Sequence, residues 1–180
     1  MKAGADLKAD HRVIRRLEAT LRAMAAKIAK GETISPDDVE EAIKLMLEFV
    51  DSYHHAKEEA GLFPVIQGAA KEQQKVVYGF LVEHEFARRA ARRIEQEFAI
   101  WIKEGNDVEP FSRFLLTYAD FLKTHTEKED RWFVEVDAKL LSAEQQREVL
   151  GRFAEVSEGR PGSKKDFVRR VNGLARKYVV

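Results

Sequence analysis

Residues 43–64 read IKLMLEFVDSYHHAKEEAGLFP and place two adjacent histidines near the end of a predicted helix. On an α-helix, residues three, four or seven positions apart share a face. The residues four, seven and eleven positions before His54 are all apolar, namely Val50, Leu47 and Ile43. His54 is therefore predicted to point into a core, and Glu58, one turn later, is predicted to point inward with it.

The second histidine of this pair has different neighbours. His55 follows three charged residues on its own face, which are Lys44, Glu48 and Asp51. Adjacent residues on an α-helix lie about 100° apart, so both histidines cannot face the same way. We expect His55 to point toward water and Glu59 to lie on the polar face or at its edge.

Helix start and stop signals divide the chain around this stretch into four long helices. The first ends at Gly31, the second starts with a Ser35 cap and is broken by Leu62-Phe63-Pro64, a loop runs through Gly68, and the third ends at Gly105-Asn106. The expected helices are about Ala5 to Lys30, Pro36 to about Gly61, about Lys71 to Glu104, and Val108 or Pro110 to about Leu140. Long helices with short links predict an all-α, up-down-up-down four-helix bundle over residues 1–140.

Residues 141–180 are predicted to form a C-terminal extension of one or two further helices. Capping-box patterns start at Ser142 and at Ser163, and each predicts the first turn of a helix. From Arg160 onward the chain holds seven Lys or Arg and a single acid, Asp166. We expect this basic amphipathic helix to pack on the acidic bundle. Contact with a protein partner, an anionic surface or a second copy in a homodimer is the alternative.

The composition excludes several classes of protein. The chain has no cysteine, which excludes disulfide scaffolds, cysteine-ligated zinc and iron–sulfur clusters. Lys plus Arg and Asp plus Glu both number 31, so no net charge attracts nucleic acid or a membrane, and we expect neither as a partner. With no apolar run of membrane-spanning length and no secretory signal at the start, the expected location is cytoplasmic.

The other helices also carry polar residues on apolar faces. His84 lies among Val77, Phe80, Ala87 and Ala91, and His125 follows Phe114, Tyr118 and Phe121 on its face and precedes Glu129 by one turn. His11 has a mostly apolar face that also includes Arg15 and Glu18. In an up-down-up-down bundle these levels fall in the same half. The inward residues are His11, His54, Glu58, His84, His125 and Glu129.

A layer of six buried polar groups needs compensation. Each unpaired group costs about 1–3 kcal/mol, which together would consume most of a typical stability. A hydrogen-bonded polar layer is one solution, and a metal centre satisfies all six groups at once. If both glutamates bridge two ions, each ion receives two histidines and two carboxylate oxygens. Nitrogen and oxygen ligands with open positions favour iron, then manganese, with zinc as a further alternative. The Glu-x-x-His pattern of ferritin-like di-iron proteins is absent.

These motifs resemble the hemerythrin-like (HHE cation-binding) family over about residues 5–140. The resemblance lies in Asp10-His11-Arg12, His54-His55-Ala-Lys-Glu58-Glu59-Ala-Gly-Leu-Phe-Pro64, Glu83-His84-Glu85 and His125-Thr-Glu-Lys-Glu129-Asp130. It implies a non-haem di-iron centre with a bridging oxo or hydroxo group, ligated by the same six residues. Oxygen-carrying members have a second histidine one turn after the third-helix histidine, where this chain has Arg88. The ion bound by His84 and His125 is therefore expected to lack one protein ligand.

Five further residues are candidates for contact with the site or with its ligand. They are Arg88 at the rim, Tyr118 two turns before His125, Glu18 two turns after His11, and His55 and Glu59 in the second helix. The leading hypothesis is a di-iron protein that binds O2, NO or peroxide for sensing, storage or detoxification. A di-iron peroxidase- or oxidase-like enzyme is one alternative, and a metal-dependent regulatory module with the basic helix as its output is another.

Overall fold

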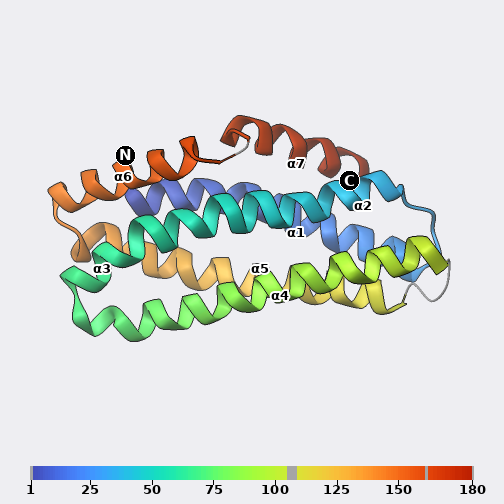
Figure 1. The fold of residues 1–180 in the computed structure, drawn as a ribbon, viewed down its shortest axis with the longest axis horizontal. Coiled ribbons are helices and arrows are strands. Elements are labelled where there is room, and N and C mark those ends of the chain that lie inside the picture. The colour runs from blue at the N-terminus through green and yellow to red at the C-terminus, as the bar shows by residue number, and fades with distance from the viewer. Residues whose placement is uncertain (1, 105–108, 161, 180) are drawn as a thin grey trace.

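The computed structural model describes residues 2–104, 109–160 and 162–179, and within these ranges the chain is helical without strands. Four long helical segments run alternately up and down the molecule (Figure 1). They are α1 (Ala3–Ala29), a segment that starts as α2 (Pro36–Leu45) and ends as α3 (Phe63–Ala69), α4 (Gln74–Glu104) and α5 (Glu109–Glu135). The predicted all-α, up-down-up-down four-helix bundle is confirmed.

The segment between α2 and α3 is wound differently from its flanks. Met46–His55 and Glu58–Leu62 are π-helical, so their backbone hydrogen bonds span five residues rather than four. The turns are wider, and each residue advances around the axis by a smaller angle than in an α-helix. A helical wheel drawn at 100° per residue therefore assigns some residues of this segment to the wrong face.

The predicted break at Leu62-Phe63-Pro64 and the loop through Gly68 are wrong. The helix continues as α3 through Ala69, and the chain turns at Ala70. Pro64 is tolerated because it stands in the first turn of α3, directly after the π-helical segment, where a missing N–H costs little and its fixed φ suits the helix. A short 3-10 turn, Lys71–Gln73, then leads into α4.

The other helix ends follow the capping signals closely. α5 continues as a π-helical turn, Val136–Leu140, and α6 (Ala143–Glu158) and α7 (Lys164–Tyr178) begin with the capping boxes of Ser142 and Ser163. Ser35 occupies the N-cap of α2, but its side chain makes no capping hydrogen bond. The predicted stop at Gly105-Asn106 and the start at Val108 lie outside the described residues.

The apolar core consists of two clusters. The larger contains Leu17, Leu21 and Phe49, and the smaller, at the end where α3 and α6 lie, contains Leu7, Phe63 and Phe133. Between them lies a level of buried polar side chains, the polar layer: His11, His54, His55, Glu58, His84, His125 and Glu129. All four long segments contribute to this layer.

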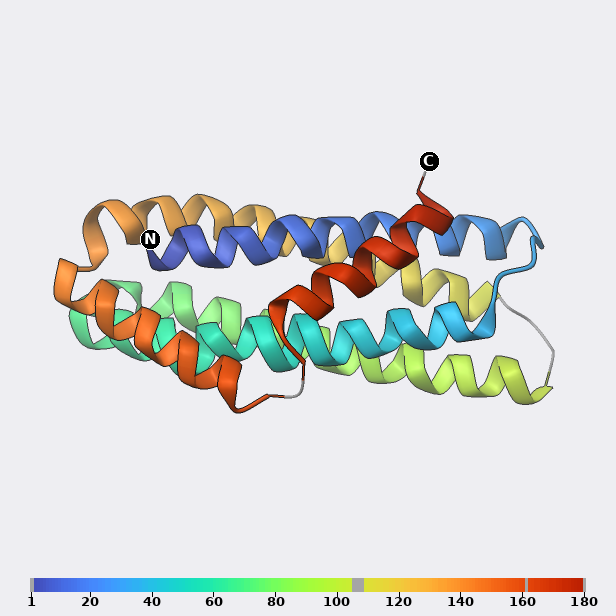
Figure 2. The ribbon, with the colours of Figure 1, turned by 90° about the horizontal axis from the view of Figure 1, so that it is seen from above.

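The two C-terminal helices cover the bundle on the side of α1 and α2, and α7 crosses both helices diagonally (Figure 2). Phe167, Val171 and Leu174 of α7 are buried against the larger core cluster. Two basic residues of α7, Arg170 and Lys177, pair with acids of the α2–α3 segment. Arg170 lies 2.6 Å from both Glu41 and Glu48, Lys177 lies 2.6 Å from Asp38, and the Tyr178 hydroxyl donates to Asp38 over 2.8 Å.

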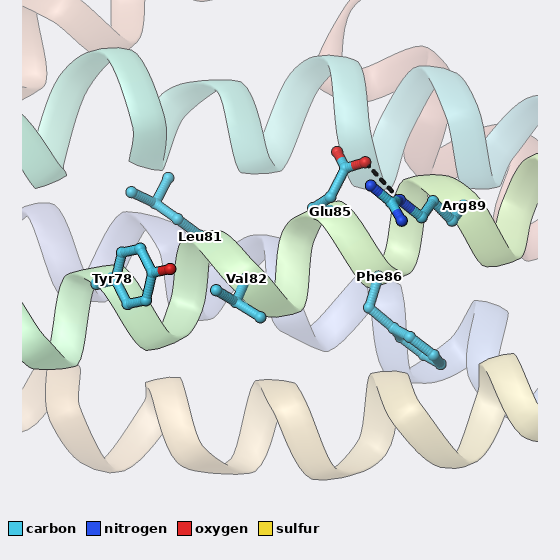
Figure 3. Close-up of a pocket in the computed structure, with 6 residues that line it drawn as sticks. All are labelled: Tyr78, Leu81, Val82, Glu85, Phe86 and Arg89. Carbon is cyan, nitrogen blue, oxygen red and sulfur yellow. Dashed lines mark hydrogen bonds and ion pairs between the residues drawn. The ribbon is translucent and has the colours of Figure 1, made fainter.

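The outer face of α4 carries an apolar pocket around Tyr78, Val82 and Phe86, flanked by the Glu85–Arg89 ion pair (Figure 3). None of the five histidines lines it. In the described ranges, no helix combines the length and the apolar character that crossing a membrane requires.

Candidate metal centre

The six residues predicted to face inward lie together at one level of the bundle. The side chains of His11, His54, Glu58, His84 and Glu129 are 0% exposed, and that of His125 is 1% exposed. Their Nε2 atoms and carboxylate oxygens converge. His11 Nε2 lies 3.0 Å from His54 Nε2 and 3.3 Å from Glu129 Oε2. The helical wheels thus placed these six side chains correctly.

His55 is also part of this layer, and its predicted exposure to water is wrong. Its side chain is 0% exposed and its ring stacks on His84, with 3.9 Å between ring centroids. The cause is the π-helical winding of Met46–His55, whose smaller rotation per residue lets both histidines face the interior. The sequence held one signal for this, because Glu58 and Leu62 lie three and seven residues after His55 and so share its face.

The polar layer divides into two groups of candidate ligands. His11 and His54 form the two-histidine group, and their ligand atoms lie within 4.8 Å of oxygens from Glu58 and Glu129. His55, His84 and His125 form the three-histidine group, whose nitrogens also lie within 4.8 Å of one another. Either group could hold one ion.

Both glutamates face both groups. Glu58 Oε1 lies 3.7 Å from His54 Nε2, while its Oε2 lies 3.3 Å from His84 Nε2. Glu129 Oε2 lies 3.3 Å from Nε2 of both His11 and His125, and its Oε1 lies 3.5 Å from His84 Nε2. This is the arrangement that two bridging carboxylates require.

Each imidazole has a carboxylate behind it, at Nδ1. The distances from Nδ1 are 2.8 Å for His11 to Asp130, 2.7 Å for His84 to Glu59, 2.8 Å for His125 to Glu83, 3.5 Å for His55 to Asp51 and 3.7 Å for His54 to Asp10. For His11, His84 and His125 the carboxylate is within hydrogen-bond distance, so it holds the proton at Nδ1, turns the Nε2 lone pair inward and makes it a better metal ligand. Of these carboxylates, only Glu59 was a candidate from the sequence. Asp10, Glu83 and Asp130 were missed because partners on different helices leave no trace in local spacing. Asp51 lies four residues before His55 on the same helix and was missed because His55 was expected to face water.

Many polar atoms of the layer have no hydrogen-bond partner in the described part of the chain. They include both carboxylate oxygens of Glu58 and of Glu129, and Nε2 of His55, His84 and His125. Orphaned atoms of this kind cost about 1–3 kcal/mol each, and more where charged. They are lone-pair donors that point at one another, and a cation between them would satisfy them. The donor set therefore fits metal ions bound by nitrogen and oxygen.

The charges of the layer are strongly coupled without a metal. Burial opposes a charge on His11, but the hydrogen bond to Asp130 and the nearby carboxylate of Glu129 outweigh it and raise the pKa of His11 to about 9. Burial likewise opposes a charge on His84, yet Glu129, Glu58 and Glu59 raise its pKa well above the usual value. For His55, burial and then the neighbouring His84 lower the pKa well below the usual value. Protons on His11 and His84 thus balance the carboxylates, and a metal ion would displace them.

Arg88 lies behind the three-histidine group. It donates to Asp51 over 2.8 Å and to Glu59 over 2.5 Å, and these are the carboxylates behind His55 and His84. The guanidinium of Arg88 therefore faces these two carboxylates, while Glu85 on the same helix pairs with Arg89. His55 offers a third candidate nitrogen beside His84 and His125, in the region where a protein ligand was expected to be lacking.

The remaining two candidates stand apart from the histidines. Tyr118 is 1% exposed and packs beside Phe121, and among the described residues its hydroxyl makes no hydrogen bond. Burial raises its pKa, so it stays a neutral phenol. Glu18 forms an ion pair with Arg22 on its own helix.

Comparison with known proteins agrees with this geometry. The model of the hemerythrin HHE cation-binding domain matches residues 3–136, which include every member of the polar layer. Neither the curated proteins nor the solved structures gave a match. The match covers most of the chain and all four long helical segments, and the chain belongs to the hemerythrin HHE cation-binding domain family.

Proposed function

We propose that this protein binds two iron ions in the polar layer and, at these ions, a small ligand: O2, NO or peroxide. His11 and His54 hold one ion, His55, His84 and His125 hold the other, and Glu58 and Glu129 bridge the two. The observation that carries the proposal is the pair of buried glutamates whose orphaned oxygens face both histidine groups. Manganese is the next alternative for this ligand set, and zinc is third.

The two ions differ in their number of protein ligands. The ion in the two-histidine group receives two nitrogens and two oxygens, while the ion in the three-histidine group receives three nitrogens and two oxygens. With a bridging oxo or hydroxo group and six-coordinate ions, the second ion would have no open position and the first would keep one. The small ligand would therefore bind at the ion held by His11 and His54, where iron, when bound, would supply an open coordination position and, for O2, the reducing electrons.

Residues around the candidate ligands orient the imidazole rings and exclude water. Asp130, Glu59 and Glu83 fix three imidazole rings in the orientation that directs Nε2 inward. Phe133 and Phe121 pack against His11 and His125, with ring centroids 5.5 and 5.2 Å away, and exclude water from the layer. A dry site with prepared donors favours a stable, strongly coupled pair of ions.

The test is metal analysis with optical spectra on protein reconstituted with Fe(II) without oxygen and then exposed to air. Two irons per chain, with the near-ultraviolet absorption of an oxo- or carboxylate-bridged pair after exposure, support the proposal. Fewer than one metal ion per chain would overturn it. Parallel loading with Mn(II) and Zn(II) shows whether iron is preferred.

A further inference from the structure

A buried cluster of charges lies behind His54, on the side away from the glutamates. Lys57 is 1% exposed, and its Nζ lies 2.6 Å from Asp6 Oδ2 and 2.7 Å from Asp10 Oδ2. The ring of Phe153, from α6, lies 4.9 Å from the same Nζ. Asp10 is 0% exposed and is the carboxylate that faces His54 Nδ1.

Asp10 also reaches the C-terminal extension. Its Oδ1 lies 2.6 Å from Nζ of Lys164, the first residue of α7. The capping box of Ser163 fixes the helix start at this point. Lys164 thus connects α7, which lies outside the residues matched by the family model, with a residue that touches the two-histidine group.

Of the five carboxylates behind the imidazoles, Asp10 is held the most loosely to its histidine. The Asp10–His54 distance is 3.7 Å, longer than a hydrogen bond, whereas Asp130 lies 2.8 Å from His11. Asp10 has two lysines as partners, one at each oxygen. One carboxylate therefore faces three groups that are cationic or become so when a metal binds.

Metal binding at His54 Nε2 makes the imidazole more positive and its Nδ1 proton more acidic, which strengthens its attraction for Asp10. Lys164 competes for the same carboxylate, and its charge repels the ion across a buried, low-dielectric space. Lys57 is fully enclosed and cannot leave. Lys164 is 35% exposed, and at the end of a surface helix it can turn its ammonium group into water.

We propose that Lys164 is a positioning residue through which docking of α7 and metal binding oppose each other. Metal binding to the two-histidine group loosens the first turn of α7, and the contact of Lys164 with Asp10 lowers the affinity of that group for its ion. This inference rests on the proposed metal binding, but not on the identity of the metal. Coupling between two sites is reciprocal, so both directions have the same magnitude. The conformation of the first turn of α7 then depends on whether the two-histidine group holds its ion.

The test uses the full chain with Lys164→Met, Lys164→Arg as the conservative variant, and Lys165→Met as the matched control, since Lys165 is exposed on the next position. Competition with a chelator, using Fe(II) without oxygen and Zn(II), measures the affinity of each ion. Hydrogen exchange of the α7 amides, with and without metal, measures docking. α7 stays attached in every variant because Phe167, Val171 and Leu174 remain buried.

We expect Lys164→Met to bind the ion of the two-histidine group about 5-fold more tightly or better, and Lys164→Arg and Lys165→Met to behave as wild type. Metal should speed exchange in the first turn of α7 in wild type and leave it unchanged in Lys164→Met. Unchanged affinity in Lys164→Met, weaker binding, or exchange that metal does not affect overturns the coupling. Wild-type protein that takes up no metal overturns the proposed function as well, so the two failures are distinguishable.

Discussion

The two-histidine and three-histidine groups share both glutamates and yet are built differently. His11, His84 and His125 lie on α-helices, whereas His54 and His55 both lie in the π-helical segment Met46–His55. The third imidazole of the three-histidine group, His55, faces inward because this segment is π-helical. One change in helical winding therefore gives the two groups unequal numbers of nitrogen donors, and with them unequal roles for the two ions.

Removing a shared glutamate tests the symmetric part of this comparison and has the largest expected effect. Glu129→Gln takes a carboxylate from both groups, so we expect metal content to fall from two ions per chain to below one. Elemental analysis after reconstitution and desalting is the measurement. Glu127→Gln, at an exposed position on the same helix, is the control and should keep both ions. Retention of two ions in Glu129→Gln contradicts the bridging role.

Substituting the adjacent histidines His54 and His55 tests the difference in histidine number between the two groups. His54→Ala leaves one imidazole in its group, and we expect that ion to be lost outright. His55→Ala leaves two in the other group, and we expect that ion to be kept but released to a chelator about 10- to 100-fold faster. Stopped-flow chelation resolves the two ions. Equal effects of the two variants, or none from His55→Ala, would remove His55 from the ligand set.

Substituting the carboxylates that contact Nδ1 of the histidines is expected to lower metal affinity by less than removing a candidate ligand. Asp130→Asn keeps a hydrogen-bond acceptor at His11 but removes the charge, and the expected loss is about 10-fold in affinity for the two-histidine ion alone. Glu83→Gln should do the same at His125, for the three-histidine ion. Chelator titration of both variants checks this. If either variant lowered the affinity for both ions equally, the carboxylates would not act on one group alone.

The smallest effect is expected where α7 covers the helices that carry His11 and His54. Arg170→Met removes ion pairs to Glu41 and Glu48 that are partly exposed, which corresponds to about 1 kcal/mol of unfolding free energy. Denaturant unfolding of the metal-free protein measures it. The metal content should stay unchanged, and a variant that loses metal would show that α7 affects the site by more than its contact at Lys164.

Much of the fold could be predicted from the sequence because its signals are local. Capping boxes at Ser142 and Ser163, the Ser-Pro start of α2 and apolar faces at helical spacing define the bundle. The six inward residues followed from the same spacing. His55 was misplaced because the prediction assumed α-helical geometry in a segment that is π-helical. Pro64 was taken as a helix break, whereas it stands in the first turn of α3, where proline is tolerated. Asp10, Glu83 and Asp130 were missed because their histidines lie on other helices.

The wide turns before His55 have a consequence for how this chain tolerates changes in length. A π-turn accommodates one more residue than an α-turn between the same two flanks, so it behaves as a single-residue insertion absorbed within a helix. Deleting one residue between Met46 and Tyr53 would let the backbone return to regular winding without moving the bundle. The helix would then present one histidine of the pair to the interior and the other to water. Deletion of one residue would thus reduce the set of candidate metal ligands from seven residues to six.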